Sequence, residues 1–237
     1  MLLFYVRHGD PIYSPDGLTE QGKAQAEALK YRFKKYGLDE IYSSTSNRAY
    51  LTAKPTADYL GKDVTMLEWC HEGLCWKELT VEKDGERQWL FHNAEWVKKM
   101  NEEIIKNGGE RWYDAPDFKD HSFKNCIMRI ERETDEFLAS FGYVHNRQGK
   151  FYSAAKRNEK RVALFAHQGF GLAFLSAVLD VPYPVMCTRF DLGHSSVTTI
   201  DFTEEGEFII PKVLQLANDS HLYKENLPTK YNNRIEF

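Results

Sequence analysis

The hydrophobic and polar positions of this 237-residue chain follow two patterns that alternate along its length. Short apolar runs rich in aromatic and branched residues lie within residues 2–6 and 161–166, as is typical of strands buried on both faces of a sheet. In residues 21–36 and 123–141 apolar positions recur instead at helical spacing, and a glycine that can end a helix directly follows each segment. Strands and helices that alternate in this way predict an α/β fold, a three-layer α/β/α sandwich with a mostly parallel central sheet.

Shorter segments complete the expected order of elements. Further strands are expected at residues 39–44, 62–67, 197–202 and 208–213, and further helices at residues 48–60, 95–105 and 172–179. Loops are expected at residues 10–17, 68–73 and 181–184, a hairpin around residues 146–149 and a turn at residues 204–206.

Residues 74–160 are the least regular part of the chain, because tryptophans and phenylalanines are scattered there among charged residues. No repeat, linker or low-complexity segment divides the sequence. We therefore expect one domain over residues 1–237, into which a helical and irregular cap segment at about 74–160 is inserted.

Polar side chains follow both of the strongest predicted strands. Arg7, His8 and Gly9 end the first, and His167 ends the strand at 161–166, shortly before Gly169. Ligands of open α/β sheets bind at the carboxyl ends of the strands. Each motif alone also fits an ordinary strand end, but the repetition at one sheet edge favours a shared site.

A cation and two carboxylates are expected near the same edge. Arg48 falls in the first turn of a helix, where the dipole disfavours a cation unless it helps the free amides to hold an anion. An exposed surface arginine is the alternative at this position. Glu68 and Glu72 lie in the loop after the strand at 62–67.

Cysteine spacing raises the question of a metal. Cys70 and Cys75 lie close together beside a histidine, but no second pair of ligands of zinc-site spacing occurs elsewhere in the chain. The four cysteines are scattered, so free thiols and no bound metal are expected.

Charge and composition narrow the classes of partner. The net charge of −4 gives no overall attraction to nucleic acid. No run of about 18 apolar residues is present to cross a membrane, and residues 2–6 are too short for the core of a signal peptide. A cytoplasmic protein that binds neither nucleic acid nor membrane is expected.

Two histidines, two arginines and a carboxylate that converge on one sheet edge fit phosphoryl transfer. Arginines are fork-shaped donors that match phosphate oxygens. A neutral imidazole is a competent nucleophile, and the nearby cations favour the neutral form of His8. A carboxylic acid beside the leaving oxygen would act as a general acid.

As a set, these residues resemble the histidine phosphatase superfamily, also called phosphoglycerate mutase-like. The resemblance rests on Arg7-His8-Gly9, Arg48 with Thr52 and Ala53, Glu72, His167 with Gly169, and Ser196-Val-Thr198, and it covers nearly the whole chain in order. It implies the sandwich fold and a phosphohistidine intermediate.

The resemblance also implies roles for single residues. His8 would be the nucleophile and Glu72 the proton donor, because Glu68-Trp-x-x-Glu72 is similar to the acid loop of the family. Glu68 stays open as the alternative donor. The implied phosphate pocket, in which His167 also takes part in catalysis, consists of Arg7, Gly9, Arg48 and His167.

Some positions depart from the family pattern. Gln168 stands where the family usually has glycine, and His194 where asparagine is common, shortly before Ser196. These three residues are candidates for secondary contacts with substrate. The loop after Gly9 is short and lacks the asparagine that mutases use, which favours a phosphatase over a mutase.

The sequence thus predicts an enzyme, a phosphatase that hydrolyses a small phosphorylated metabolite without a cofactor. A mutase that returns the phosphoryl group to its substrate and a non-catalytic phospholigand-binding protein are the alternatives. The oligomeric state is left open, with a homodimer as one option.

Overall fold

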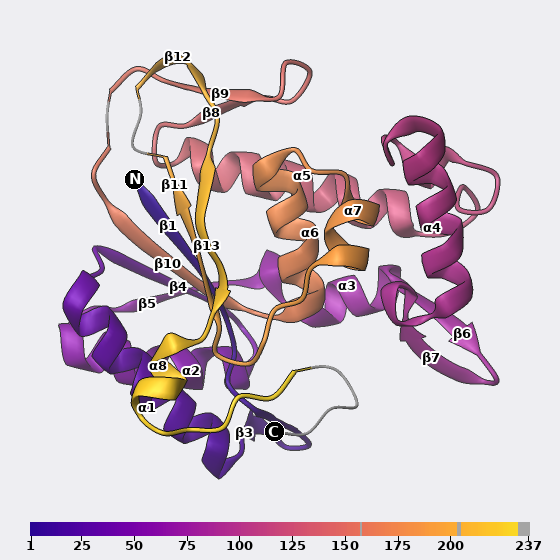
Figure 1. Cartoon of the computed structure of the whole chain (residues 1–237). Coiled ribbons are helices and arrows are strands. Elements are labelled where there is room, and N and C mark those ends of the chain that lie inside the picture. The colour runs from indigo at the N-terminus through magenta and orange to yellow at the C-terminus, as the bar shows by residue number, and fades with distance from the viewer. Residues whose placement is uncertain (157, 203–204, 232–237) are drawn as a thin grey trace.

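A six-stranded sheet with helices on both faces forms the centre of the computed structural model, which describes residues 1–156, 158–202 and 205–231 (Figure 1). The strands are β1 (Leu2–Arg7), β2 (Pro11–Tyr13), β3 (Asp16–Leu18), β4 (Glu40–Ser44), β5 (Val64–Leu67), β6 (Thr80–Lys83), β7 (Glu86–Trp89), β8 (Val144–Asn146), β9 (Phe151–Ala154), β10 (Arg161–Ala166), β11 (Val197–Asp201), β12 (Gly206–Ile209) and β13 (Lys212–Asn218). The helices are α1 (Glu20–Tyr36), α2 (Asn47–Leu60), α3 (Glu72–Glu78), α4 (Ala94–Asn107), α5 (Phe123–Ala139), α6 (Gln168–Leu179), α7 (Tyr183–Arg189) and α8 (Ser220–Lys224), with short 3-10 turns at Glu68–Cys70, Leu90–His92 and Trp112–Asp114.

The order of strands across the sheet is β13-β11-β1-β10-β4-β5. Strands β1, β10, β4 and β5 run parallel, and β11 is antiparallel to both of its neighbours. The carboxyl ends of the four parallel strands therefore meet at one edge. This arrangement confirms the predicted α/β fold with a mostly parallel sheet.

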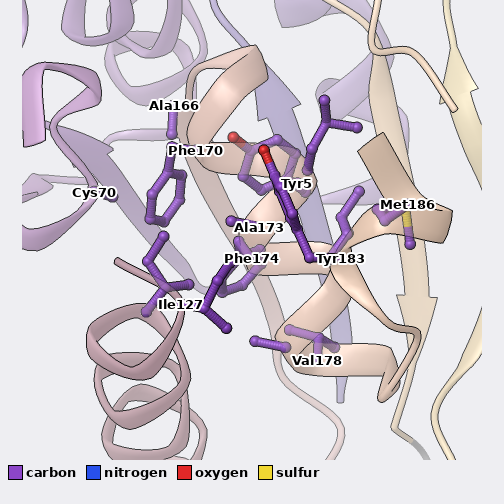
Figure 2. Packing of buried hydrophobic residues seen from close by; sticks show 14 of the residues in the cluster. Tyr5, Cys70, Ile127, Ala166, Phe170, Ala173, Phe174, Val178, Tyr183 and Met186 are labelled. Carbon is purple, nitrogen blue, oxygen red and sulfur yellow. The ribbon is translucent and has the colours of Figure 1, made fainter. Parts of the chain in front are cut away.

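Strand β1 is buried because its side chains feed both layers of the core. Leu3 and Tyr5 pack on the face covered by α5 and α6, whereas Phe4 and Val6 pack with residues of α1 and α2 on the other face. Tyr5 stacks on Phe174 of α6 with 5.4 Å between ring centroids, and Figure 2 shows the rings of this layer close together. Burial of each such side chain stabilises the fold by about 1.5–3 kcal/mol.

Helix ends follow their sequence signals where the sequence is clear. Thr19 caps α1, and its side chain accepts a hydrogen bond of 3.0 Å from the amide of Gly22. Gly37 ends the same helix with a φ of 70°, a conformation that favours glycine. The predicted helices α1, α2, α4 and α5 and the hairpin β8–β9 are confirmed.

Several predicted loops are wrong because they contain short regular elements. The first loop folds into the hairpin β2–β3, and the Glu68–Glu72 segment forms a 3-10 turn followed by the start of α3. Helix α6 begins at Gln168 and not at residue 172, and α7 begins at Tyr183 because prolines suit a first helical turn.

The expected last strand is also corrected. It is divided into β12, which pairs with β9 in a separate sheet, and β13, which pairs with β11 in the main sheet. Part of the expected turn before it, residue 204, lies outside the described residues.

Within residues 74–160, α5 packs against α6, whereas α4 and the hairpin β6–β7 extend away from the sheet (Figure 1). Among the helices of the described ranges, none is both long and apolar enough to cross a bilayer.

Candidate active site

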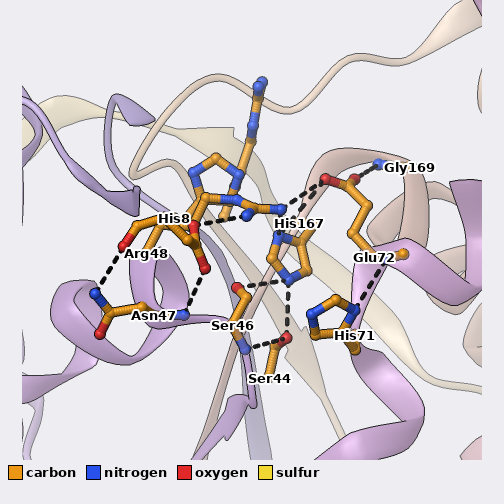
Figure 3. A network of polar contacts seen from close by, with 12 residues as sticks. His8, Ser44, Ser46, Asn47, Arg48, His71, Glu72, His167 and Gly169 are labelled. Atoms are coloured by element: carbon orange, nitrogen blue, oxygen red, sulfur yellow. Dashed lines mark hydrogen bonds and ion pairs between the residues drawn. The ribbon is translucent and has the colours of Figure 1, made fainter. Parts of the chain in front are cut away.

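The candidate site lies at the carboxyl ends of β1 and β10 and at the starts of two helices (Figure 3). Strand β1 ends with Arg7 and is followed by His8, and β10 is followed by His167. Arg48 comes from the first turn of α2 and Glu72 from the first turn of α3. The predicted central residues therefore come together, and both histidines and both arginines are buried.

His8 presents one ring nitrogen to the site. Its Nδ1 lies 2.7 Å from the carbonyl oxygen of Gly9. A carbonyl only accepts, so Nδ1 carries the proton and Nε2 keeps its lone pair. Burial, His167 and Arg7 hold the pKa of His8 well below its usual value, and the neutral ring is the nucleophilic form.

Gly9 allows the close turn that holds this ring. A Cβ on Gly9 would lie 2.7 Å from the carbonyl oxygen of Gly22, so a larger residue would push β1 away from α1. The amide of Gly9 donates to Thr52 Oγ1 at 2.9 Å and so ties the turn to α2.

Arg48 is inside the site, and the alternative of an exposed surface residue is wrong. One terminal nitrogen of Arg48 lies 2.8 Å from a carboxylate oxygen of Asp16, and the other lies 3.3 Å from Glu72 Oε2. The second nitrogen is also 3.2 Å from Nδ1 of His167. An arginine held by several partners at a helix start is placed to bind an anion.

His167 has the opposite tautomer to His8. Arg48 can only donate, so Nδ1 of His167 accepts and its Nε2 carries the proton. That Nε2 lies 2.8 Å from Ser44 Oγ and 3.2 Å from Ser46 Oγ. Burial and the charge of Arg48 lower the pKa of His167 well below its usual value.

Glu72 completes the set as the first residue of α3, and not as a loop residue. Its Oε1 accepts from the amide of Gly169 at 2.9 Å, and its Oε2 lies 3.6 Å from Nδ1 of His167. Burial raises the pKa of Glu72 although Arg48 opposes the shift. A carboxyl with a raised pKa is suited to general acid work.

Glu68 lies apart from this set. Its side chain is exposed and accepts a hydrogen bond of 2.8 Å from Thr45 Oγ1. The 3-10 turn that separates Glu68 from α3 accounts for the difference between the two carboxylates.

His194 contacts the site through Arg7. A terminal nitrogen of Arg7 lies 2.8 Å from Nε2 of His194, whose Nδ1 is 3.3 Å from Asp10. Because Arg7 donates, Nδ1 of His194 carries the proton toward the carboxylate. Burial and Arg7 lower the pKa of His194 to about 3.

The other two secondary candidates have less direct contacts. The backbone carbonyl of Ser196 accepts from the amide of Arg7 at 3.2 Å, and this residue is buried. Gln168 donates to the exposed Asp191, so its side chain is directed toward the rim and not toward the centre.

Asp16 and Trp89 belong to the surroundings of the site but carry no local sequence signal. Asp16 reaches Arg48 because the β2–β3 hairpin folds back over α2. A Cβ on Gly169 would lie 2.4 Å from the ring of Trp89, so residues 74–160 reach the edge of the site at this point.

Nitrogen and oxygen atoms of His8, Glu72 and His167 lie within 4.8 Å of one another, the one group in the described part of the chain with a metal-like spacing. Cys70 and Cys75 are buried and take no part in it. Arg48 lies 3.3 Å from the carboxylate of this group. A guanidinium so close disfavours a divalent cation and favours an anion.

Comparison with known proteins agrees with this geometry. The model of the histidine phosphatase superfamily (branch 1) matches residues 3–117. Phosphoserine phosphatase 1 of Hydrogenobacter thermophilus is 26% identical over 222 residues, which are 88% of this chain and 90% of that protein. The chain is thus similar to members of the histidine phosphatase superfamily.

Solved structures of phosphatases show the same fold as this chain. The phosphoserine phosphatase of Entamoeba histolytica has a TM-score of 0.60 and 20% identity, and the match covers 93% of this chain and 98% of that one. A mycobacterial glucosyl-3-phosphoglycerate phosphatase has a TM-score of 0.57 and 21% identity, with coverage of 90% and 97%.

Proposed function

We propose that this chain is a histidine phosphatase and that it hydrolyses a phosphomonoester of a small metabolite through a phosphohistidine on His8. The observation that carries the proposal is the state of His8: a neutral ring, with its proton held by Gly9 and its Nε2 lone pair left free. Arg7 and Arg48 place donors around this nucleophile that can bind phosphate oxygens, and His167 lies against Arg48.

In the first step, Nε2 of His8 attacks phosphorus as the bond from phosphorus to the leaving oxygen breaks. Arg7 and Arg48 stabilise the charge on the phosphoryl oxygens. Both guanidinium groups are preorganised: Arg7 donates to Leu192 and His194, and Arg48 is held by Asp16 and Glu72.

The leaving oxygen takes its proton from Glu72. The hydrogen bond from the amide of Gly169 fixes one carboxyl oxygen, so the other is presented to the site beside His167. In the second step the Glu72 carboxylate accepts a proton from water, whose oxygen attacks phosphorus. The bond from phosphorus to Nε2 of His8 then breaks, and inorganic phosphate is released.

We further propose that residues 74–160 act as a cap over a single domain and select the substrate. The contact between Trp89 and Gly169 supports this role, because it brings β7 next to the amide that holds Glu72. The named activity of the Hydrogenobacter relative makes phosphoserine the first substrate to test.

Four buried free cysteines support a reducing compartment, and we place the enzyme in the cytoplasm on that basis. Arg7 and Arg48 supply the positive charge that a metal provides in other phosphatases, so the proposed reaction needs no cofactor.

The experiment is a screen of phosphorylated metabolites for phosphate release, with His8→Ala as the control. The purified protein should release phosphate without a bisphosphate primer and in the presence of a chelator, and His8→Ala should not. A requirement for a primer would indicate a mutase, and loss of activity with the chelator that magnesium restores would exclude this mechanism.

A further inference from the structure

A second cavity lies between α1 and α8, and the candidate active site contributes none of its lining residues. Its volume is about 190 Å³. Figure 1 shows α8 beside α1, and the last described residues of the chain follow α8. The cavity is lined by two tyrosines and several cationic side chains, including Arg32.

Arg32 is a buried cation with neutral partners. It is 8% exposed, and its terminal nitrogens donate to Asn218 at 2.8 and 2.9 Å and to Gln215 at 2.8 Å. Within the described ranges it forms no ion pair, and its Nε has no hydrogen-bond partner. Buried arginines are almost always paired with an anion, so the positive charge of this one favours an anionic ligand in the cavity.

Most of the other charges in the lining of the cavity are also positive, although Asp219, outside the lining, acts on Arg32. Lys35 and Lys224 lie on its exposed rim, and Glu225 is the one carboxylate in the lining. Glu225 lies 3.2 Å from Lys224 and offsets its charge. The lining therefore keeps a net excess of positive charge from Arg32 and Lys35. This excess contrasts with the net charge of −4 of the whole chain.

Two tyrosines provide flat walls beside these cations. Tyr31 is 44% exposed and Tyr36 is 43% exposed, so both rings can contact a ligand. The guanidinium of Arg32 lies 5.8 Å from the centre of the Tyr36 ring, and the amine of Lys224 lies 5.9 Å from that of Tyr31. Flat rings next to cations suit a ligand that joins a ring to an oxyanion.

We propose that this cavity is a second ligand site, which binds a small molecule that carries a phosphate or phosphonate group on a flat ring. Arg32, Lys35 and Lys224 contact the oxyanion, and Tyr31 and Tyr36 contact the ring. The site is separate from the proposed catalytic centre and does not depend on its activity.

Arg32 is not a suitable residue for the test, because it also supports the active site. Its Nη1 lies 3.5 Å from Nδ1 of His221, and Nε2 of His221 lies 3.0 Å from Ser195 Oγ. The amide of Ser195 in turn donates to the carbonyl of His8 at 3.0 Å. A change at Arg32 would reach the nucleophile, whereas Lys35 and Lys224 are exposed.

The probe is phenylphosphonate, which joins a ring to an oxyanion by a bond that phosphoester hydrolysis does not break. Isothermal titration calorimetry would compare the wild-type chain, the double variant Lys35→Glu with Lys224→Glu, and a control double variant with the same change of net charge. The control, Lys98→Glu with Lys106→Glu, alters exposed residues of α4.

We expect two binding events per chain in the wild type and in the control. In the Lys35→Glu, Lys224→Glu variant, one event should weaken at least tenfold, while hydrolysis of nitrophenyl phosphate stays within twofold of the wild type. Inorganic phosphate should bind the second site more weakly than phenylphosphonate. One binding event in the wild type, or two unchanged events in the lysine variant, would overturn the proposal; equal affinity for the two probes would overturn the ring contact.

Discussion

The two central histidines, His8 and His167, differ in which ring nitrogen carries the proton, and this difference gives them different roles. The Gly9 carbonyl accepts a hydrogen bond from Nδ1 of His8, so the proton stays on that nitrogen and Nε2 is left for attack. His167 keeps its proton on Nε2 toward Ser44 and Ser46, so its Nδ1 meets the cation and the acid of the site. The partner of His8 is a backbone carbonyl, and the partners of His167 lie far away in the sequence, at the end of β4 and just after it. The sequence around each histidine therefore could not predict which nitrogen carries the proton.

Glu72 can be tested through the leaving group. Glu72→Gln should strongly slow hydrolysis of alkyl phosphates, because an alkoxide must be protonated as it leaves. It should slow hydrolysis of nitrophenyl phosphate much less, because nitrophenolate departs without a proton. The measurement is kcat/KM for both substrates in the wild type and the variant.

Glu68→Gln is the matched control, because the side chain of Glu68 is exposed and bonded to Thr45. It should affect the two substrates alike. If Glu68→Gln lowers kcat/KM for alkyl phosphates much more than for nitrophenyl phosphate, and Glu72→Gln does not, the roles of the two carboxylates are reversed.

Arg48 tests the phosphate pocket. Removal of one preorganised donor to a developing charge typically lowers kcat by about 10²–10³, so Arg48→Ala should lower kcat for nitrophenyl phosphate to that extent. Arg48→Lys should recover only part of the loss, because a point charge cannot replace the fork that contacts two partners. Circular dichroism checks that both variants fold; an unchanged kcat in Arg48→Ala would return this residue to a structural role.

At the scale of elements, His145 joins β8 to α5 and to the end of α6. Its Nδ1 lies 2.8 Å from Asp135 and its Nε2 lies 2.9 Å from Asp180. Burial lowers the pKa of His145, but the hydrogen bonds to both carboxylates outweigh burial and raise it. The protonated histidine therefore holds three elements together.

This contact makes stability depend on pH. A pKa raised in the folded state gives stability that is fully present below the ordinary histidine value of about 6.5 and is lost as pH rises through the folded value. His145→Gln should cost about 1.5–3 kcal/mol at pH 5.5, the range for hydrogen bonds to charged groups, and less at pH 9. Urea unfolding at both pH values measures the difference.

The exposed His121 offers a control for this measurement. His121→Gln should give the same small change at both pH values. A cost of His145→Gln that stays constant or grows as pH rises would show that this ring is not held as a cation.

The sequence predicted elements well where one physical signal dominated. An apolar run followed by charged residues suffices for β1 and β10, and helical spacing with a terminal glycine suffices for α1 and α5. It failed at α7 and at the start of α6, since helices of seven residues or with two early glycines have weak periodicity. It failed at β12 and β13 because strand pairing across the molecule decides which apolar residues join which sheet.

At the scale of the whole molecule, the positions of polar residues at the ends of predicted strands were sufficient to predict which side chains lie together in the site. The carboxyl ends of parallel strands share one edge, so Arg7, His8 and His167 had to be neighbours. The contacts of Asp16 and Trp89 could not be predicted in the same way, because they depend on how a hairpin and an inserted segment fold back onto the sheet.

The cap proposal predicts a separation between substrate recognition and phosphate binding. Trp89→Ala should raise KM for the substrate found in the screen, because the ring borders the side of the site that holds Glu72. Inhibition by inorganic phosphate should be unchanged, because the arginines and histidines stay in place. Phe208→Ala, at an exposed residue of β12, is the control; equal weakening of substrate and phosphate by Trp89→Ala would contradict a role in substrate selection.

The phosphohistidine itself is the most direct test of the proposed chemistry. The purified enzyme would be mixed with substrate, quenched in alkali within milliseconds and digested, and the modified peptide identified by mass spectrometry. We predict a phosphoryl group on His8 that is stable in alkali and lost in acid, and a phosphorylated fraction that increases in Glu72→Gln with nitrophenyl phosphate. A phosphoryl group on His167, or turnover of substrate with no phosphorylated histidine in any quenched sample, would contradict it.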